Sequence, residues 1–271
     1  MYLTRHQTDD GPRWAADGRF LPSRYVLGLL LALPAEKIAA AVAGLQSDET
    51  ADGPLLPPLE ADQEVWASGV TYLRSRDARQ TESDVGDVYE RVYDAERPEI
   101  FLKATGWRVV GPDGPIRVRR DSGWNVPEPE LTLVINQQGT IVGYCAGNDV
   151  SSREIEGANP LYLPQAKLYN GSCALGPGIR LAGAEEMKSL AVGLEIFRGG
   201  GSVFQGETDI GQMKRSLTEL ADCLYDELDF PQGVFLMTGT GIVPPDEFSL
   251  QPGDVVHISV GDLKIENEVR E

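Results

Sequence analysis

Three acidic residues surround one predicted β-hairpin, in the segment NVPEPELTLVINQQGTIVGYCAGNDVSSR at residues 125–153. Glu128 and Glu130 are alternate residues, and alternate residues of a strand point to the same face of a sheet. If Asp149 joins them, each pair of carboxylates about 4 Å apart repels by roughly 4 kcal/mol at an effective dielectric of about 20. A divalent cation removes that repulsion, and carboxylate oxygens suit Mg²⁺, Mn²⁺ or Ca²⁺ better than zinc. The residue types and spacing therefore point to a hard-cation site.

The position of Asp149 depends on how the hairpin turns. If residues 137–140 form a four-residue loop, Asn136 lies opposite Ile141, and counting back along both strands places Asp149 opposite Glu128. A three-residue loop would shift this register by one residue. In an alternative interpretation, both glutamates lie on the solvated face of a strand while Asp149 caps the turn that follows. The hairpin alone leaves both interpretations open.

The elements that must position these residues are mostly short strands. From Glu99 onward the strand-like segments are EIFLKAT, GPIRVRR, LTLVINQQGTIVGYCAG, LAVGLEIFRGGGSVFQGET, VFLMTGTGIV and DVVHISVGDLKIENEV, and one helix, GQMKRSLTELADCLY, interrupts them. Upstream, EVWASGVTYLRSRDAR predicts a strand that runs into a polar helix, and SDVGDVYERVYDAERP predicts a helix that ends at Pro98. Many short strands joined by glycine turns favour a mostly antiparallel β architecture with a few helices, an α+β fold.

A segment rich in acidic residues, proline and glycine predicts a linker at residues 46–63. We therefore divide the chain into a small N-terminal region with its linker, residues 1–63, and a catalytic domain, residues 64–271. Before the linker, the apolar run ahead of Pro34 predicts a short buried strand or turn, and a helix follows from about Pro34 to Leu45. This length suits a small cap or a dimer element.

Charge and hydropathy exclude several classes of protein. The 271 residues carry a formal net charge of −18, which disfavours nucleic acid and anionic membranes, because both are bound mainly by lysine and arginine. The longest apolar run, residues 25–34, falls short of the roughly 20 residues of a membrane helix, and the N-terminus lacks signal-peptide organisation. Three cysteines without C-x-x-C spacing predict buried thiols. We expect a soluble, cytoplasmic protein.

Several other polar residues have contexts that usually indicate surface or turn roles. Lys167 follows a proline-flanked segment predicted as a loop, NPLYLPQA, and Lys103 alternates with apolar neighbours in a strand, where a lysine commonly faces solvent. Arg153 follows Asp149 by four residues, so it is suited to pair with a carboxylate of the hairpin or with a substrate carboxylate. Thr240 in TGTG offers a hydroxyl beside close-approach N–H groups, although such a segment more often makes a turn.

The order of the motifs from about Val65 to Val269 resembles the fumarylacetoacetate hydrolase superfamily, whose members hold a divalent metal with an E-x-E pair and a later aspartate. The matching motifs are PEPEL, GNDVSSR, LPQAK, GETDIGQM, TGTG and LQPGDVV. Within the superfamily, the segments EVWASGVTYLRSR, YERVYDAERPEIFLKATGWRVVGP and EIEGANPLYLPQAK are most similar to the 2-keto-3-deoxy-D-arabinonate dehydratases of oxidative pentose catabolism.

The resemblance implies a fold, a cofactor and a set of site residues. The implied fold is a mixed β-roll or β-sandwich with a small N-terminal region. The implied metal is Mg²⁺, with Mn²⁺ or Ca²⁺ as alternatives, held by Glu128, Glu130 and Asp149 beside a catalytic Lys167. The implied substrate contacts are Arg74, Ser75, Arg76, Lys103, Arg153 and Thr240. Family habit also leads us to expect a homodimer or homotetramer.

One departure from the family pattern bears on the reaction. Hydrolytic members of the family typically show a pattern like N-Y-x-x-H-x-x-E, in which the histidine and glutamate activate a water. Residues 71–78 here read TYLRSRDA, so Ser75 replaces the histidine and Ala78 replaces the glutamate. This difference disfavours C–C bond hydrolysis and favours a reaction that expels water.

We therefore expect a metal-dependent hydro-lyase that dehydrates a 2-keto-3-deoxy pentonate, a small 2-oxo acid, to 2,5-dioxopentanoate. Polarising the C2 ketone acidifies the C3 hydrogens, after which the C4 hydroxyl is eliminated. Lys167 and an acidic residue of segment 74–90 are the candidate base and acid. An acylpyruvate hydrolase or oxaloacetate decarboxylase of the same superfamily is the nearest alternative. A binding protein without activity is a further alternative, against which the intact metal-site carboxylates and lysine argue.

Overall fold

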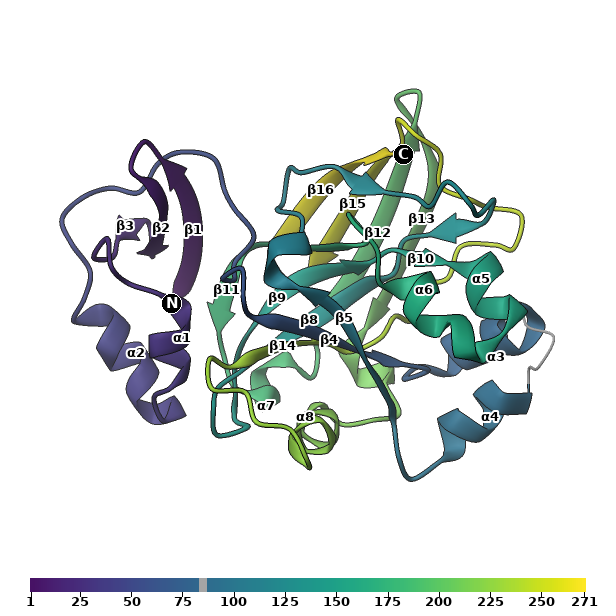
Figure 1. The fold of residues 1–271 in the computed structure, drawn as a ribbon, viewed down its shortest axis with the longest axis horizontal. Helices are drawn as coiled ribbons and strands as arrows, with labels where there is room; N and C mark the ends of the chain where they lie inside the picture. Colours follow the sequence, from purple (N-terminus) through teal and green to yellow (C-terminus); the bar gives the residue numbers. More distant parts are fainter. Residues whose placement is uncertain (83–86) are drawn as a thin grey trace.

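The chain folds into two β-sheets packed face to face, with helices around them (Figure 1). The computed structural model describes residues 1–82 and 87–271, and the side chains of all of these except 79–82 and 87–89. Within these residues the larger sheet has nine strands in the order β3-β2-β1-β11-β9-β8-β14-β4-β5. The smaller sheet has the order β13-β12-β15-β16-β6, and β7 pairs with β10. The predicted mostly antiparallel α+β architecture is confirmed, with parallel pairing of β14 with β4 and of β16 with β6.

The bounds of the elements follow chain order. The strands of the larger sheet are β1 (Tyr2–Thr8), β2 (Gly11–Ala16), β3 (Arg19–Phe20), β4 (Glu64–Gly69), β5 (Glu99–Thr105), β8 (Pro129–Ile135), β9 (Ile141–Asp149), β11 (Cys173–Leu181) and β14 (Val234–Met237). The other strands are β6 (Ile116–Arg117), β7 (Asn125–Val126), β10 (Ser151–Ser152), β12 (Ala191–Arg198), β13 (Gly201–Asp209), β15 (Val255–Val260) and β16 (Leu263–Arg270). The helices are α1 (Leu27–Leu31), α2 (Ala35–Ala43), α3 (Leu73–Glu82), α4 (Asp87–Asp94), α5 (Arg153–Ala158), α6 (Leu163–Lys167), α7 (Ala184–Met187) and α8 (Leu217–Tyr225). Short 3₁₀ turns are η1 (Gly106–Arg108), η2 (Pro160–Tyr162) and η3 (Ile210–Gln212).

Side-chain alternation along the central strands supplies a core on each face of the larger sheet. In β8, Leu131 and Leu133 pack toward the smaller sheet with Ile258 of β15. Their neighbour Val134 packs on the opposite face with Phe235 and the apolar residues of α1 and α2. Strands β8 and β9 are buried along their whole lengths, as expected for central strands covered on both faces. The residues at the ends of these two strands are therefore held rigidly.

The N-terminal region extends the larger sheet, which the sequence analysis did not predict. Strand β1 pairs with β11 through Leu3 and Ile179, so the hairpin β1–β2 and strand β3 continue the sheet at the left of Figure 1. The prediction of a strand or turn ahead of Pro34 is wrong, because residues 27–31 form α1. Its buried Leu27, Leu30 and Leu31 have the i, i+3, i+4 spacing of a helix face. The helix predicted after Pro34 is confirmed as α2.

Helices cover the side of the molecule where β4 ends and where β5 and β8 begin. The predicted passage from a strand to a polar helix is confirmed by β4 and α3, and α4 ends before Pro98 as predicted. The single helix predicted after Glu99 is α8, but α5, α6 and α7 interrupt the strands as well. The predicted loop before Lys167 is a 3₁₀ turn followed by α6, with Pro160 and Pro164 in first-turn positions that need no N–H donor. None of the described helices combines the length and apolar character needed to cross a bilayer.

Candidate functional site

The predicted carboxylate cluster forms at the end of the β8–β9 hairpin that lies away from its loop. Glu128 immediately precedes β8, Glu130 lies within it, and Asp149 is the last residue of β9. The three residues are 3%, 1% and 1% exposed, respectively. One carboxylate oxygen from each lies within 4.8 Å of the others. The alternative of a solvated strand face is therefore wrong.

The strand register brings Asp149 to the glutamates as predicted. The amide of Asp149 donates a hydrogen bond to the carbonyl of Glu128 at 3.0 Å, which places the two residues opposite each other. The turn itself differs from the prediction, because Ile135 rather than Asn136 lies opposite Ile141. A one-residue irregularity at the loop end of the hairpin then restores the predicted register along the rest of the two strands.

Lys167, at the C-terminal end of α6, lies directly against the carboxylates. Its ammonium donates hydrogen bonds to Glu128 Oε2 at 2.7 Å, Asp149 Oδ2 at 3.1 Å and Ser151 Oγ at 2.7 Å. The residue is 3% exposed, so the interpretation as a surface lysine is wrong. The short helix after η2 explains this placement, because it turns the side chain inward at the end of a segment that otherwise lies on the surface.

Two further cations support the cluster from within the protein. Lys103 of β5 is fully buried, forms an ion pair with Asp149 and donates to the carbonyl of Val150 at 3.0 Å. Arg153, the first residue of α5, pairs through Nη1 with Glu128 Oε1 at 2.7 Å. Each of these carboxylates is thereby held between two cations, which fixes its position and offsets the mutual repulsion.

Glu130 has a different environment from its two neighbours. The amide of Gly239, after β14, donates to Glu130 Oε2 at 2.6 Å. Burial, followed by the nearby charges of Asp149 and Glu128, raises the pKa of Glu130 well above its usual value, and Lys167 opposes the shift. A bound divalent cation would reverse this penalty by favouring the ionised carboxylate.

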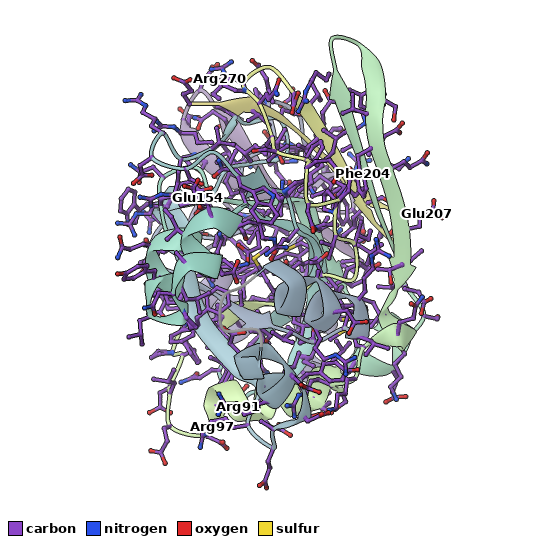
Figure 2. All side chains as sticks on the ribbon, turned by 90° about the vertical axis from the view of Figure 1, so that its right-hand side faces the viewer. Arg91, Arg97, Glu154, Phe204, Glu207 and Arg270 are labelled. Carbon is purple, nitrogen blue, oxygen red and sulfur yellow. The ribbon has the colours of Figure 1, made fainter. Side chains whose placement is uncertain are left out.

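A cavity lies beside the cluster, and its lining includes residues of α3 and α5, the helices that face the viewer in Figure 2, where Glu154 of α5 marks the outer surface. The room it offers to a water-sized molecule is about 20 Å³, within about 310 Å³ of empty space that includes the opening to solvent. Strands β4 and β5, helices α3, α5 and α6 and the segment after β14 all contribute to its wall. The lining residues are Ser68, Gly69, Val70, Ser75, Glu99, Phe101, Glu128, Glu156, Lys167, Gly239 and Thr240. The cavity therefore brings Glu128 and Lys167 to one space beside the cluster, and that space must widen to admit a substrate.

Two of the predicted substrate contacts line this cavity. Ser75 lies in α3, where its hydroxyl donates to the carbonyl of Tyr72 at 2.8 Å. Thr240 follows β14, and its hydroxyl lies 3.2 Å from the amide of Ile242. Both hydroxyls have backbone partners, so binding a substrate oxygen would require them to share or exchange those contacts.

The other predicted substrate contacts do not line the cavity in the described part of the chain. Lys103 and Arg153 lie behind the carboxylates, as given above. Arg74 lines a neighbouring surface hollow instead, with Nη2 at 3.4 Å from the carbonyl of Val243. Arg76 pairs with Asp77 at 2.7 Å on the surface. The helical geometry of α3 explains the difference, because adjacent residues of a helix point in different directions, and Ser75 is the one directed inward.

The acidic residue predicted in segment 74–90 is not identified among the described side chains. Asp77 forms the surface pair with Arg76, and Glu90 is exposed. The side chains of residues 79–89, which include three of the segment's acidic residues, lie outside the described part of the structure.

Two acidic residues that the sequence analysis missed line the cavity. Glu99 begins β5 and is partly buried. Glu156 of α5 is 4% exposed and pairs with Arg153 Nη1 at 3.2 Å. The spacing of Arg153 and Glu156, one helical turn apart, was a readable signal for the second of these. No local pattern marked the first, because its place depends on the pairing of β4 with β5.

The three clustered carboxylates fit a hard divalent cation. They offer only oxygen donors, and both histidines of the chain lie elsewhere, with His6 in β1 and His257 in β15. Buried Cys173 is no ligand candidate either, because burial raises the pKa of its thiol to about 12 and keeps it protonated. Carboxylate oxygens without nitrogen or sulfur are the donor set of Mg²⁺, Mn²⁺ or Ca²⁺.

Comparison with known proteins agrees with these features. A probable 2-keto-3-deoxyxylonate dehydratase of Haloferax volcanii is 47% identical over 204 residues, which span 75% of this chain and 70% of that protein. A 2-dehydro-3-deoxy-D-arabinonate dehydratase of Saccharolobus solfataricus is 43% identical over 218 residues, 78% of this chain and 70% of that one. A solved 2-keto-3-deoxy-D-arabinonate dehydratase, complexed with magnesium and 2,5-dioxopentanoate, is 32% identical with a TM-score of 0.82, covering 100% and 99% of the two chains. The family model for the C-terminal part of fumarylacetoacetate hydrolase matches residues 64–270, and the chain belongs to that family.

Proposed function

We propose that this protein is a Mg²⁺-dependent hydro-lyase that converts a 2-keto-3-deoxy pentonate to 2,5-dioxopentanoate. The observation that carries the proposal is the buried cluster of Glu128, Glu130 and Asp149 with Lys167, of which Glu128 and Lys167 line a small cavity. Its support from relatives is the identity of 47% and 43% to two dehydratases of such acids and the likeness to a solved dehydratase with magnesium and product.

The names of the two relatives are compatible with a single substrate. Xylonate and arabinonate differ in configuration at C2 and C3. A 2-keto-3-deoxy acid has lost both of those stereocentres, so only C4 remains. Within the D series, the two acids are therefore the same compound. We propose the pentonate with the D configuration at C4 as the substrate, and the enantiomer at C4 as the comparison that tests it.

Each residue of the site has a proposed part in the reaction. Glu128, Glu130 and Asp149 would hold the cation, which supplies Lewis-acid polarisation of a bound 2-oxo acid. Lys167 places its positive charge beside the carboxylates, where it favours negative charge that develops on the C2 oxygen. Lys103 and Arg153 hold the carboxylates in place from behind.

The proton transfers require a base within reach of C3 to C5. A proton leaves C3, and the C4 hydroxyl departs with a proton as water. Loss of a C5 proton and return of a proton to C3 then give an enol. The enol becomes the aldehyde when C4 is protonated and the C5 hydroxyl loses its proton, so the net change is loss of one water. We assign the base to Glu99, because it is partly exposed and can exchange protons with solvent, whereas Glu156 is deeply buried and paired with Arg153.

The structure favours dehydration over acylpyruvate hydrolysis. The family pattern implies a water-activating histidine at position 75 in hydrolytic members. Here the position holds a serine, whose hydroxyl donates to the carbonyl of Tyr72. A serine hydroxyl cannot act as a general base near neutral pH as an imidazole does. Oxaloacetate decarboxylation needs no such base and remains the second candidate, because the same cation and lysine would stabilise its enolate.

The deciding experiment presents Mg²⁺-loaded protein with a panel of acids. The panel contains 2-keto-3-deoxy pentonates of both C4 configurations, an acylpyruvate and oxaloacetate, with products followed by NMR. We expect 2,5-dioxopentanoate from one pentonate at a rate well above release of pyruvate from the other acids. Faster release of pyruvate from the acylpyruvate or from oxaloacetate would reverse the assignment.

We also propose the organisation of the whole protein. Residues 64–271 form the catalytic part, and residues 1–63 the N-terminal region and linker, whose strands continue the larger sheet. A homodimer or homotetramer is proposed from family habit, to be measured by light scattering. A cytoplasmic location is proposed from the three free cysteines, which suit a reducing compartment, and cell fractionation tests it.

A further inference from the structure

Gly69 and Glu99 face each other across two paired strands at the cavity wall. Gly69 is the last residue of β4, Glu99 is the first residue of β5, and they are direct partners in the antiparallel pairing. Directly opposed residues of an antiparallel pair project to the same side of the sheet. Both residues line the cavity that holds Glu128 and Lys167. The side chain of Glu99 therefore occupies the space that a larger residue at 69 would take.

The distances show how fully that space is used. A Cβ added at Gly69 would lie 1.9 Å from Glu99 Oε2 and 2.7 Å from Glu99 Cδ. The carboxylate thus lies across the Cα of the glycine. The backbone φ angle of Gly69 is not positive, so other residue types could adopt its backbone conformation. The absence of a side chain is what the carboxylate requires.

We infer that Gly69 is a positioning residue, whose missing side chain sets the place of the Glu99 carboxylate in the cavity. The inference rests on the proposed function, in which that carboxylate takes a proton from the carbon next to a 2-oxo group. Proton transfer to a fixed base falls by roughly 100-fold when the base is misplaced by about 1 Å. A glycine at 69 therefore contributes to the reaction through the position of the Glu99 carboxylate, because it has no side chain of its own.

A Gly69→Ala variant tests the inference, because the conflicting atom is the end of a flexible side chain. The carboxylate can swing aside while the strands keep their pairing. The matched control is Gly201→Ala, at the start of β13, where an added Cβ has no neighbour closer than 3.8 Å. The assay is exchange of the C3 hydrogens of 2-oxopentanoate with deuterated solvent, measured by NMR on Mg²⁺-loaded protein. This five-carbon acid has no hydroxyl to lose, so the assay reports proton removal from C3 without the elimination step.

We expect Gly69→Ala to slow the exchange by roughly 100-fold, with the Mg²⁺ dissociation constant within about twofold of the original and Gly201→Ala unchanged. Glu99→Gln should slow the exchange as much, and adding Gly69→Ala to Glu99→Gln should cost nothing further, because both changes remove the same function. Exchange at the original rate in Gly69→Ala, or an equal further loss in the Glu99→Gln background, would overturn the inference.

Whether the variants fold provides a second test of the inference. If Gly69→Ala fails to fold, the double variant Gly69→Ala with Glu99→Ala should fold, because the conflicting carboxylate is gone. Failure of both would show that the glycine serves the backbone and would refute a positioning role. Exchange without turnover of any pentonate would contradict the proposed function and leave the positioning role intact.

Discussion

Replacing Lys167 with methionine removes one positive charge from the carboxylate cluster and keeps most of the side-chain volume. In the metal-free protein, the change removes the cation that lies 2.7 Å from Glu128 and 3.1 Å from Asp149. Breaking a buried ion pair costs about 3–5 kcal/mol. Because Arg153 still holds Glu128 and Lys103 still holds Asp149, we expect a loss of about 3 kcal/mol, the lower end of that range. This corresponds to a fall in melting temperature of roughly 6–12 °C for a chain of this size.

The same substitution should strengthen cation binding while slowing turnover. The ammonium of Lys167 occupies oxygen atoms that the proposed cation needs, so its removal should lower the Mg²⁺ dissociation constant by about 10- to 100-fold, or roughly 1.4–2.8 kcal/mol. Saturating Mg²⁺ should therefore recover most of the lost stability. Turnover should fall by about 10²–10³-fold with little change in KM, because the lysine favours developing negative charge more than the neutral ketone.

Three measurements on Lys167→Met check this reasoning: denaturant unfolding with and without Mg²⁺, a calorimetric Mg²⁺ titration, and steady-state kinetics. The matched control is Lys188→Met, a surface lysine whose side chain is 60% exposed and which should change none of the three. Near-normal turnover would remove Lys167 from the reaction. Weaker Mg²⁺ binding would show that the lysine assembles the site rather than competing for it, and would refute the electrostatic argument.

Further predictions concern the cation, pH and the thiols. Exhaustive chelation should abolish activity, Mg²⁺ should restore it, and Glu128→Gln should weaken Mg²⁺ binding by at least about tenfold; activity that survives both treatments would exclude the cation. Burial and the neighbouring carboxylates raise the pKa of Glu130 in the folded protein above its value in the unfolded chain. The stability that this group contributes is therefore fully present below the unfolded-state pKa and is lost as the pH rises through the folded-state pKa. The metal-free Glu130→Gln variant should therefore gain stability relative to the original protein between about pH 5 and pH 8 in urea unfolding, and a gap that narrows with rising pH would contradict the direction of the shift. Because Cys145 and Cys173 are buried and burial raises both thiol pKa values, alkylation of the native protein near pH 8 should modify Cys223 alone, and labelling of all three before unfolding would contradict their burial.

The local pattern of the sequence was sufficient to predict the carboxylate cluster. Alternation along β8 places Glu128 and Glu130 on one face, and hairpin pairing carries Asp149 to them over a short stretch of chain. The loop was predicted one residue too short, yet the register at the far end was right, because a compensating irregularity near Ile141 absorbs the difference. Two-residue periodicity and local pairing are properties that a single segment carries by itself.

Tertiary structure decided which other residues meet the cluster. No local pattern predicted the burial of Lys103, but the fold directs this side chain of β5 inward to an ion pair with Asp149. Family resemblance predicted both Arg74 and Ser75 as substrate contacts, although a helix can direct only one of two adjacent side chains into the cavity. Glu99 enters the cavity because β5 pairs with β4, a contact between segments about 30 residues apart that no local pattern records. The sequence thus determined the arrangement within one hairpin, whereas contacts between distant segments depend on packing of the whole chain, which local periodicity does not encode.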